Sequence, residues 1–536
     1  MTLAALRQPF TSMPGWLARL APPGEPEPVD YPFAPGDVAR LHALAGHDGH
    51  ADLDAQTWRD LLLERYGAVL APQASIFGRQ VLYRRLRAGM PDAGVATQRE
   101  RVRRLLDAPD RLDALRRSLR ALRSAEAEVA GVLFDDAAPA APPPPRLVAR
   151  APLLAVLLLA SVALALLVSP LGWIGVGGAL YLLVAMQMRW RERAVEWHKS
   201  THALQMLLRT CVLLDGSDLP LAEAFSGLRQ PAGRLGRALA RSPLATAVPG
   251  AGEYGDWFLA ANIRHYFATL RLVDREKPFL RRCFSLCAEL DADAALAHHL
   301  RGRADWCWAG RTGPRALALE GGVHPLLDGG AALSLALDGE GVFLSGQNGV
   351  GKSTFLRMLG LNLVVARAFG FCYARRAELP ALPVVASMQN EDSLLDGHSL
   401  YVAELARARD LLAAAARGPV VCLVDEVFRG TNHEESVSAA VAVLDGLARD
   451  ALVVVSSHNL VLGPLLAHRL APWRIVRAED GALRMEPGVL GTTNGVALLA
   501  QRGFDAEVQR KARQVAGWLA GQRKGEAGAD LLAPGA

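Results

Sequence analysis

The sequence predicts an α plus α/β protein. It consists of a helical core, interrupted by a two-helix transmembrane hairpin, and a C-terminal α/β domain with a Gly-rich loop. Three observations lead to this fold class. Leucines recur at three- and four-residue spacing over 41–134, as in amphipathic helices. Two long segments, 151–169 and 171–188, contain no charged residue. After residue 309 the pattern changes to short β-type runs that lead into a Gly-rich loop.

Composition restricts the class of protein. The 536 residues are enough for two or three domains, and 51% hydrophobic with 21% charged residues excludes a disordered chain. The formal charge of +5 permits contact with nucleic acid or anionic lipid without establishing either. Six cysteines without a C-x-x-C pair predict neither a zinc site nor a disulfide framework, and they fit a reducing compartment. The N-terminal segment lacks the apolar run of a secretory signal.

The parts of the chain follow from these patterns. In order they are an irregular segment 1–40, a first part of the helical core 41–134, a Pro-rich linker 135–150, the hairpin 151–188, a second part of the core 189–308, the α/β domain with C-terminal helices 309–521, and a disordered tail 522–536. The many arginines of the first core part either contact nucleic acid or form a solvated helix face balanced by acidic residues.

The apolar segments between 151 and 188 predict membrane insertion. Each just reaches the roughly 17–25 residues that a transmembrane helix needs. The basic residues that flank the pair are Arg146, Arg150, Arg189, Arg191 and Arg193. A hairpin places both flanks on one side, which the positive-inside rule makes cytoplasmic. We therefore expect a location at the cytoplasmic membrane, with the N-terminal region and the α/β domain facing the cytoplasm. A buried hairpin in a soluble core is the alternative.

Residues 344–354, LSGQNGVGKST, contain the pattern G-x-x-x-x-G-K-[ST]. An apolar run precedes it and a helical pattern follows, as the motif requires. Backbone N–H groups and the positive helix end would face a nucleotide, Lys352 would reach the outer phosphates, and the Ser353 hydroxyl would ligate Mg²⁺. A chance match in a Gly-rich chain is the alternative. The expected ATP-binding residues are Gly346, Gln347, Asn348, Gly349, Val350, Gly351, Lys352, Ser353 and Thr354.

Two further strand-like runs end in residues whose side chains can bind a metal ion or take part in catalysis. VVCLVDE, 420–426, ends in two carboxylates: Asp425 is expected to hold Mg²⁺, and Glu426 to polarise the attacking water as general base. A surface strand ending in a solvated acidic pair is the alternative. VVVSSHN, 453–459, contains His458, which is a third catalytic candidate beside Glu426 and Lys352, although a lone histidine is often structural.

The order of these motifs resembles the ATPase domain of the MutS mismatch-repair family, a branch of the ABC-type ATPases. Asn348 matches an asparagine of that family's phosphate loop. The stretch from Gly397 through Ser399 to Glu404 resembles its G-x-S-x-x-x-x-E segment, and 429–431 matches its R-G-T. His324-Pro325 and several helical stretches, including 288–297 and 493–512, extend the resemblance to about two-thirds of the chain.

The resemblance implies a helical MutS-like core followed by an ABC-type P-loop ATPase domain that hydrolyses ATP with Mg²⁺. It also implies a homodimer through the ATPase domains, in which Ser399 contacts the nucleotide of the partner subunit and His458 senses the terminal phosphate. Double-stranded DNA, in a mismatch-repair-like role, is the partner that the family implies.

The chain also departs from the family pattern. Phe428 stands where the family usually has a small residue, and Ser436 where it usually has glycine. No stretch resembles the mismatch-recognition domain or the DNA clamp, and the apolar hairpin interrupts the core instead. We therefore expect a membrane-anchored variant. The alternatives are an ATP-gated membrane scaffold that organises partners without DNA, and half of a transporter, which two spans and a missing LSGGQ segment disfavour.

Overall fold

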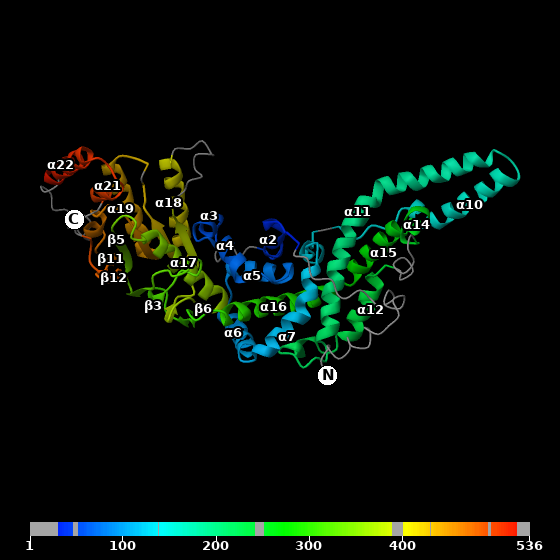
Figure 1. The fold of residues 1–536 in the computed structure, drawn as a ribbon, viewed down its shortest axis with the longest axis horizontal. Coiled ribbons are helices and arrows are strands. Elements are labelled where there is room, and N and C mark those ends of the chain that lie inside the picture. The colour runs from blue at the N-terminus through cyan, green and yellow to red at the C-terminus, as the bar shows by residue number, and fades with distance from the viewer. Residues whose placement is uncertain are drawn as a thin grey trace.

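The computed structural model describes residues 31–46, 52–137, 139–241, 251–388, 400–428, 430–490 and 495–522. The molecule is elongated (Figure 1). The α/β domain lies at one end, a helical core in the middle, and an arm formed by α10 and α11 projects at the other end.

The helical core is formed by helices that come before and after the arm in the sequence. They are α2 (Pro35–Leu44), α3 (Ala55–Asp60), α4 (Leu63–Leu70), α5 (Ile76–Ala88), α6 (Asp92–Leu106), α7 (Pro109–Leu119), η3 (Arg120–Ser124), α8 (Ala130–Phe134), α9 (Arg146–Ala149), η4 (Ala222–Phe225), α12 (Arg229–Leu239), α14 (Ala251–Phe258), α15 (Ala261–Arg275) and α16 (Lys277–Arg301). The long helix α16 buries its inner face against α5 and α6.

A buried ionic cluster joins α16 to its neighbours. The fully buried Asp293 accepts hydrogen bonds from Arg85 Nη1 at 3.0 Å and from Arg101 Nε at 2.6 Å. Two residues earlier on α16, Asp291 accepts from the backbone N–H and the hydroxyl of Ser75, at 2.9 and 2.6 Å. Because an unpaired buried charge is costly, these partners fix how α5 and α6 sit on α16.

The α/β domain is built on a six-stranded sheet with the order β12-β11-β5-β10-β9-β8. The strands are β5 (Gly341–Gly346), β8 (Val384–Ser387), β9 (Val421–Asp425), β10 (Leu452–Ser456), β11 (Leu470–Arg477) and β12 (Leu483–Pro487). Neighbouring strands are parallel except β12, which pairs antiparallel with β11. The parallel strands β5, β9 and β10 are buried along their whole length, because helices cover both faces of the sheet.

Alternate residues of β9 face different cores. Leu423 packs in the cluster that contains α17 (Lys352–Phe369), whereas Cys422 and Val424 pack with α18 (Leu400–Arg417) and α19 (His433–Asp450). α20 (Leu462–Leu465), α21 (Gly495–Gln501) and α22 (Ala506–Gln522) complete the helices of the domain. The doubly covered sheet therefore brings the ends of β5, β9 and β10 to one edge.

A smaller sheet and a two-stranded ribbon lie between the large sheet and the helical core. The strands are β1 (Cys307–Trp308), β2 (Gly310–Arg311), β3 (Ala316–Gly322), β4 (Leu333–Asp338), β6 (Phe371–Cys372) and β7 (Arg376–Leu379). The four-stranded sheet has the order β2-β7-β3-β4, and β1 pairs antiparallel with β6. The short strands expected before the phosphate loop thus form β3, β4 and β5.

Helix α3 carries contacts from the N-terminal part of the chain to the α/β domain. Thr57 Oγ1 accepts from Ala386 N at 2.9 Å, and Asp60 Oδ2 accepts from Met388 N at 2.9 Å. Arg407 of α18 donates to Asp54 Oδ2 at 3.2 Å. The carboxyl end of β8 is therefore held by residues more than three hundred positions away in sequence.

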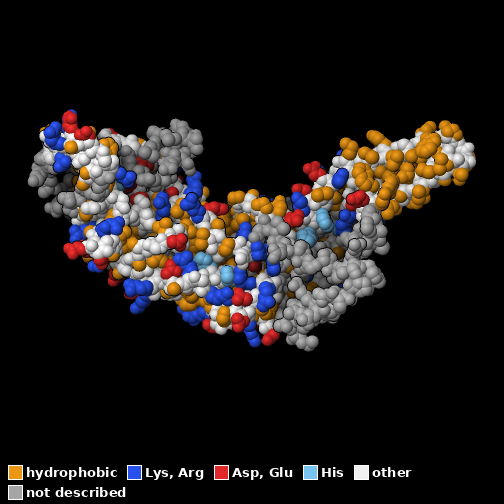
Figure 2. All heavy atoms as spheres, viewed as in Figure 1, with side chains coloured by type: hydrophobic (Ala, Val, Ile, Leu, Met, Phe, Trp, Pro, Cys, Tyr) orange, Lys and Arg blue, Asp and Glu red, His pale blue; other side chains and the backbone are white. Residues whose placement is uncertain are grey.

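The projecting arm consists of α10 (Ala151–Leu167) and α11 (Gly172–Leu214). The two helices approach closely, because a Cβ atom on Gly172 would lie 2.3 Å from Ala165 N. A small buried cluster at the base of the arm packs it on α15. Beyond this base the surface is largely apolar (Figure 2), with exposed side chains such as Leu159, Leu167 and Ile174.

Among the described residues, no helix is long and apolar enough to cross a membrane. The prediction of a transmembrane hairpin over 151–188 is therefore wrong, and the prediction of a location at the cytoplasmic membrane, which rested on it, is wrong as well. The physical reason is helix length. The turn consumes residues from both apolar segments, and α10 keeps 17 residues. This is the lower limit of the range given above, and it corresponds to about 26 Å of helix against a hydrocarbon thickness of about 30 Å. In α11 the apolar part ends before Arg189, and charged residues follow.

Candidate nucleotide site

The phosphate loop joins β5 to α17, as the sequence predicts. Gly349 and Gly351 have φ angles of 77° and 102°, a left-handed backbone that glycine adopts without steric cost. A Cβ atom on Gly346 would lie 2.9 Å from Val350 Cγ1, so the tight turn also requires glycine there. The helix begins directly after Gly351, whose carbonyl accepts from Phe355 N at 2.9 Å. The first turn of α17 therefore points its N–H groups at the loop.

The side chain of Lys352 lies inside the loop. It is 6% exposed, and its Nζ donates to Gly346 O at 3.0 Å and to Gln347 O at 3.4 Å. Burial lowers the pKa of Lys352, and the negative charges of Glu426 and Asp425 partly oppose that shift. The ammonium group is thus held at the loop by carbonyl oxygens that a phosphate oxygen could replace.

Asp425 is the last residue of β9 and is buried, at 4% exposure. It pairs in register with Ser456 of the neighbouring parallel strand β10, and the Ser456 hydroxyl donates to Asp425 Oδ1. The hydroxyl orients the carboxylate at the edge where β5 also ends. Sequence analysis did not single out Ser456, although its place at the end of an apolar run, before Ser457 and His458, is the signal that could have found it.

Glu426 follows Asp425 with a positive φ of 54°, and its N–H donates to Ser456 O at 2.9 Å. A non-glycine residue in this conformation stores strain, which is common at functional sites. The turn directs the Glu426 carboxylate to His458, whose Nε2 lies 2.6 Å from Glu426 Oε1. The other ring nitrogen of His458, Nδ1, lies 3.4 Å from Lys352 Nζ. His458 therefore bridges the phosphate loop and the end of β9.

Phe428, the first departure from the family pattern, is fully buried with a φ of 56°. Its ring packs edge-on against Tyr401 of α18, with 5.9 Å between the ring centroids. The large side chain thus fills space between α18 and α19. It links the segment after the acidic pair to the first turn of α18.

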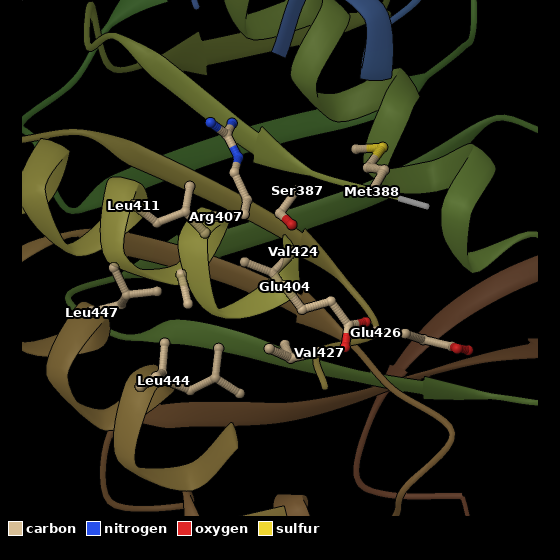
Figure 3. A pocket seen from close by; sticks show the side chains of 12 residues that line it. Ser387, Met388, Glu404, Arg407, Leu411, Val424, Glu426, Val427, Leu444 and Leu447 are labelled. Carbon is tan, nitrogen blue, oxygen red and sulfur yellow. The ribbon is translucent and has the colours of Figure 1, made fainter. Parts of the chain in front are cut away.

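A small pocket lies beside Glu426 at the ends of β8 and β9 (Figure 3). Its volume of about 20 Å³ is enough for one water molecule. Glu404 and Glu426 lie at one end of it, whereas Arg407 points away from them. Glu404 Oε2 also accepts from Gly430 N at 3.3 Å. Sequence analysis did not assign Arg407, because nothing in a helical pattern marks one arginine among several.

The structure brings Lys352, Asp425, Glu426 and His458 to one edge of the sheet. The loop residues Gln347, Asn348 and Gly349 are exposed, Gly346 and Val350 are buried, Ser353 is half-buried, and Thr354 is exposed. Ser399, expected to act on the partner's nucleotide, lies outside the described residues, as does Arg429. His324 of the HP dipeptide is buried before α17, and burial lowers its pKa.

Residues 342–475 match the protein family described as MutS domain V. These residues run from β5 to β11 and include the whole edge just described. The C-terminal half of the chain is therefore similar to MutS proteins. The DNA mismatch repair protein MutS of Thermus thermophilus is 30% identical over 264 residues, which cover 47% of this chain and 32% of that protein. MutS of Thermus aquaticus is 32% identical over 261 residues, with 47% and 32% covered.

A more distant MutS protein, from Sorangium cellulosum, is 28% identical over 263 residues, covering 46% of this chain and 28% of its own length. The chain thus spans about a third of the length of the MutS proteins it matches. The resemblance inferred from the motifs is confirmed at the level of the family.

Proposed function

We propose that the protein is a MutS-like ATPase, which binds ATP at 346–354 and hydrolyses it with Mg²⁺. The observation that carries the proposal is the contact of His458 with both Glu426 and Lys352, because it joins a candidate general base to the phosphate loop. If His458 had only a structural role, it would need neither of these two contacts.

The residues present fit ATP and Mg²⁺. The loop offers a concave turn with two left-handed glycines and a cation already held by carbonyl oxygens, which suits a phosphate group. Asp425 offers a buried carboxylate at the same edge, and the half-buried Ser353 follows Lys352 at the start of α17. Oxygen ligands of this kind are those that Mg²⁺ prefers. The ion would neutralise charge on the phosphates during phosphoryl transfer.

The protein groups would divide the remaining work. Lys352 would bind the outer phosphates as a point charge. Glu426 would accept a proton from the attacking water, while the N–H of His458 holds the carboxylate in place. His458 would also lie close to the terminal phosphate, because it already contacts Lys352. Ser456 would keep Asp425 oriented without touching the substrate.

We further propose a homodimer through the ATPase domains. In this arrangement Ser399 completes the site of the partner subunit, and Phe428 with Tyr401 transmits the state of the acidic pair to the start of α18, where the Ser399 segment ends. A monomer would then hydrolyse ATP slowly.

The proposed partner of the ATPase cycle is double-stranded DNA, in keeping with the mismatch-repair function named for the relatives. One observation favours a second candidate, an ATP-gated protein that organises protein partners without DNA. Residues 151–188 contain no lysine or arginine, so the end of the arm offers no cation to a phosphate backbone, whereas exposed apolar side chains suit a protein partner.

The ATPase rate of the purified protein, with and without duplex DNA, distinguishes these functions when it is measured together with DNA retention at several salt concentrations. Stimulation by DNA and a steep loss of retention with rising salt support the DNA function, because phosphate contacts release counterions. ATP hydrolysis without any effect of DNA supports the second candidate. If the wild-type protein, alone or with duplex DNA, hydrolyses ATP no faster than Glu426→Gln does, the ATPase proposal fails.

A further inference from the structure

Two cysteines face each other at the junction between the helical core and the α/β domain. Cys307 of β1 and Cys372 of β6 are direct partners in the antiparallel register, and their Sγ atoms lie 3.7 Å apart. Directly opposed residues of an antiparallel pair have Cα atoms about 4.5–5.5 Å apart, within the usual range for a disulfide. Both are free thiols. The backbone thus already has the spacing that a bond between them needs.

The two cysteines lie just after the central helix of the core and the helix that begins at the phosphate loop. β1 comes shortly after α16, the central helix of the core, and β6 comes directly after α17, the helix that begins at the phosphate loop. Only two residues of each strand pair in this ribbon. A covalent bond would enclose the segment between the two cysteines, which contains the entire phosphate loop. It would also tie the end of the core to the end of α17.

The two thiols differ in a way that suits stepwise oxidation. Cys307 is partly exposed, whereas Cys372 is fully buried. A hydrogen bond with the Cys372 thiol lowers the pKa of Cys307, and burial only partly opposes this, while the same hydrogen bond and burial raise the pKa of Cys372. Cys307 is therefore the thiol that an oxidant reaches, and Cys372 is the one placed to resolve the product.

We propose that Cys307 and Cys372 are a redox-active pair that forms a reversible disulfide with a hydroperoxide as oxidant. The Cys307 thiolate attacks the terminal oxygen of the hydroperoxide and the O–O bond breaks. The alkoxide leaves, or hydroxide in the case of hydrogen peroxide, and Cys307 becomes a sulfenic acid. Cys372 sulfur then attacks Cys307 sulfur, the S–O bond breaks, and water leaves with the thiol proton. With hydrogen peroxide, the two thiols lose two electrons and two protons in total, and two water molecules form. A dithiol reductant restores both thiols by exchange.

A second pair in the same chain is a matched internal control. Cys211 of α11 and Cys287 of α16 have Sγ atoms 3.6 Å apart, as close as the first pair. Both are fully buried between helices. If the closeness of two thiols were sufficient, both pairs would oxidise. The proposal instead requires that the oxidant reach Cys307, and it predicts that Cys211 and Cys287 stay reduced in the folded protein.

The test treats the full-length protein with a few equivalents of hydrogen peroxide, blocks remaining thiols, and digests it with trypsin without reduction. Cleavage after Arg303, Arg311, Arg367 and Arg375 should release peptide 304–311 joined to peptide 368–375. We expect this linked species, a loss of two of the six thiols, and reversal of both by dithiothreitol. Cys307→Ser should abolish all three results.

Thermal unfolding gives a readout that does not depend on peptide mapping. Closing so long a loop should raise the melting temperature by about 5 °C or more, since the bond constrains the unfolded chain. The rise should disappear with dithiothreitol and in Cys372→Ala, measured against each variant's own reduced form. Linkage of Cys211 to Cys287 instead, oxidation of Cys307 to sulfinic acid with Cys372 still free, or equal thiol loss in Cys307→Ser would overturn the proposal.

Discussion

His458 Nε2 lies 2.6 Å from Glu426 Oε1, so one ring nitrogen faces this carboxylate while the other faces the phosphate loop. Lys352 Nζ, 3.4 Å from Nδ1, can only donate, so Nδ1 accepts and the ring proton is on Nε2, directed at Glu426. The ring of His458 thus orients the carboxylate that we propose as general base. Positive φ at Glu426 and a backbone bond to Ser456 hold the other end of that residue.

Glu426→Gln should slow ATP hydrolysis about 10²-fold or more while leaving ATP binding nearly unchanged. The amide cannot accept a proton from water, but it keeps the size of the side chain and an oxygen for the His458 N–H. Single-turnover hydrolysis and nucleotide titration measure the two effects separately. Glu434→Gln, an exposed change on the first turn of α19, is the control. Wild-type turnover by Glu426→Gln would show that the base is assigned to the wrong residue.

Lys352→Ala should weaken ATP binding by at least about tenfold. The lysine supplies the only buried cation among the described residues of the loop, and its loss leaves the phosphates facing backbone groups alone. Titration with a fluorescent ATP analogue measures the dissociation constant. Lys511→Ala, which removes a surface pair with Glu507 on α22, should leave affinity unchanged. An unaltered affinity in Lys352→Ala would place the nucleotide elsewhere.

The site shows what local sequence can and cannot predict. The phosphate loop, β5 and α17 were predictable, because glycine conformations, an apolar strand and a helix start are encoded in consecutive residues. Asp425, Glu426 and His458 were located by the ends of apolar runs. The bond from Ser456 to Asp425 depends on the register of β9 against β10, which no local pattern contains.

Longer-range features were less accessible still. The docking of α3 on β8 depends on Asp60 and Met388, which are far apart in the chain and carry no shared pattern. The prediction of a transmembrane hairpin was wrong for a different reason. Counting uncharged residues over 151–188 ignored those that the turn between α10 and α11 removes from the helices. Apolar composition therefore predicted the two helices and their pairing but not what surrounds them.

Asp60→Asn should make the protein more stable at pH 7 than the wild type, by about 1–3 kcal/mol. Burial raises the pKa of Asp60 to about 6, although bonds and charges from Met388, Arg407 and Arg357 oppose it. In the unfolded chain the group titrates near 3.8. The folded state therefore binds more protons than the unfolded state between these pH values. The contribution of Asp60 to the free energy of unfolding is fully present below about pH 3.8 and is lost as pH rises through about 6.

Asparagine keeps an oxygen for Met388 N without a charge, so the advantage of Asp60→Asn should vanish near pH 4. Thermal melts from pH 4 to 8 test this. Asp54→Asn is a control of opposite sign: burial works to raise the pKa of Asp54, but Arg407 and hydrogen bonds with Thr57 outweigh it and lower that pKa. Asp54→Asn should therefore be destabilising at neutral pH. A difference between Asp60→Asn and wild type that does not vary with pH would contradict the prediction.

Asp293→Ala should destabilise the helical core by about 3–5 kcal/mol. Asp293 is fully buried and is the shared partner of Arg85, on α5, and Arg101, on α6. Arg85 is itself buried, so removal of the carboxylate leaves a cation with no counter-charge in a site that water does not reach easily. Arg101 retains Glu289 at 3.1 Å and is therefore less affected.

Urea unfolding followed by circular dichroism measures this cost as a lower midpoint of the helical transition. Asp113→Ala is the matched control, because Asp113 pairs with Arg301 at 3.1 Å on the surface, where such pairs contribute about 0–1 kcal/mol. The double variant Arg85→Met with Asp293→Leu should recover part of the loss, since two apolar side chains can replace a buried ion pair. Equal, small effects of Asp293→Ala and Asp113→Ala would mean that water solvates Arg85 and that this cluster does not hold α5 on α16.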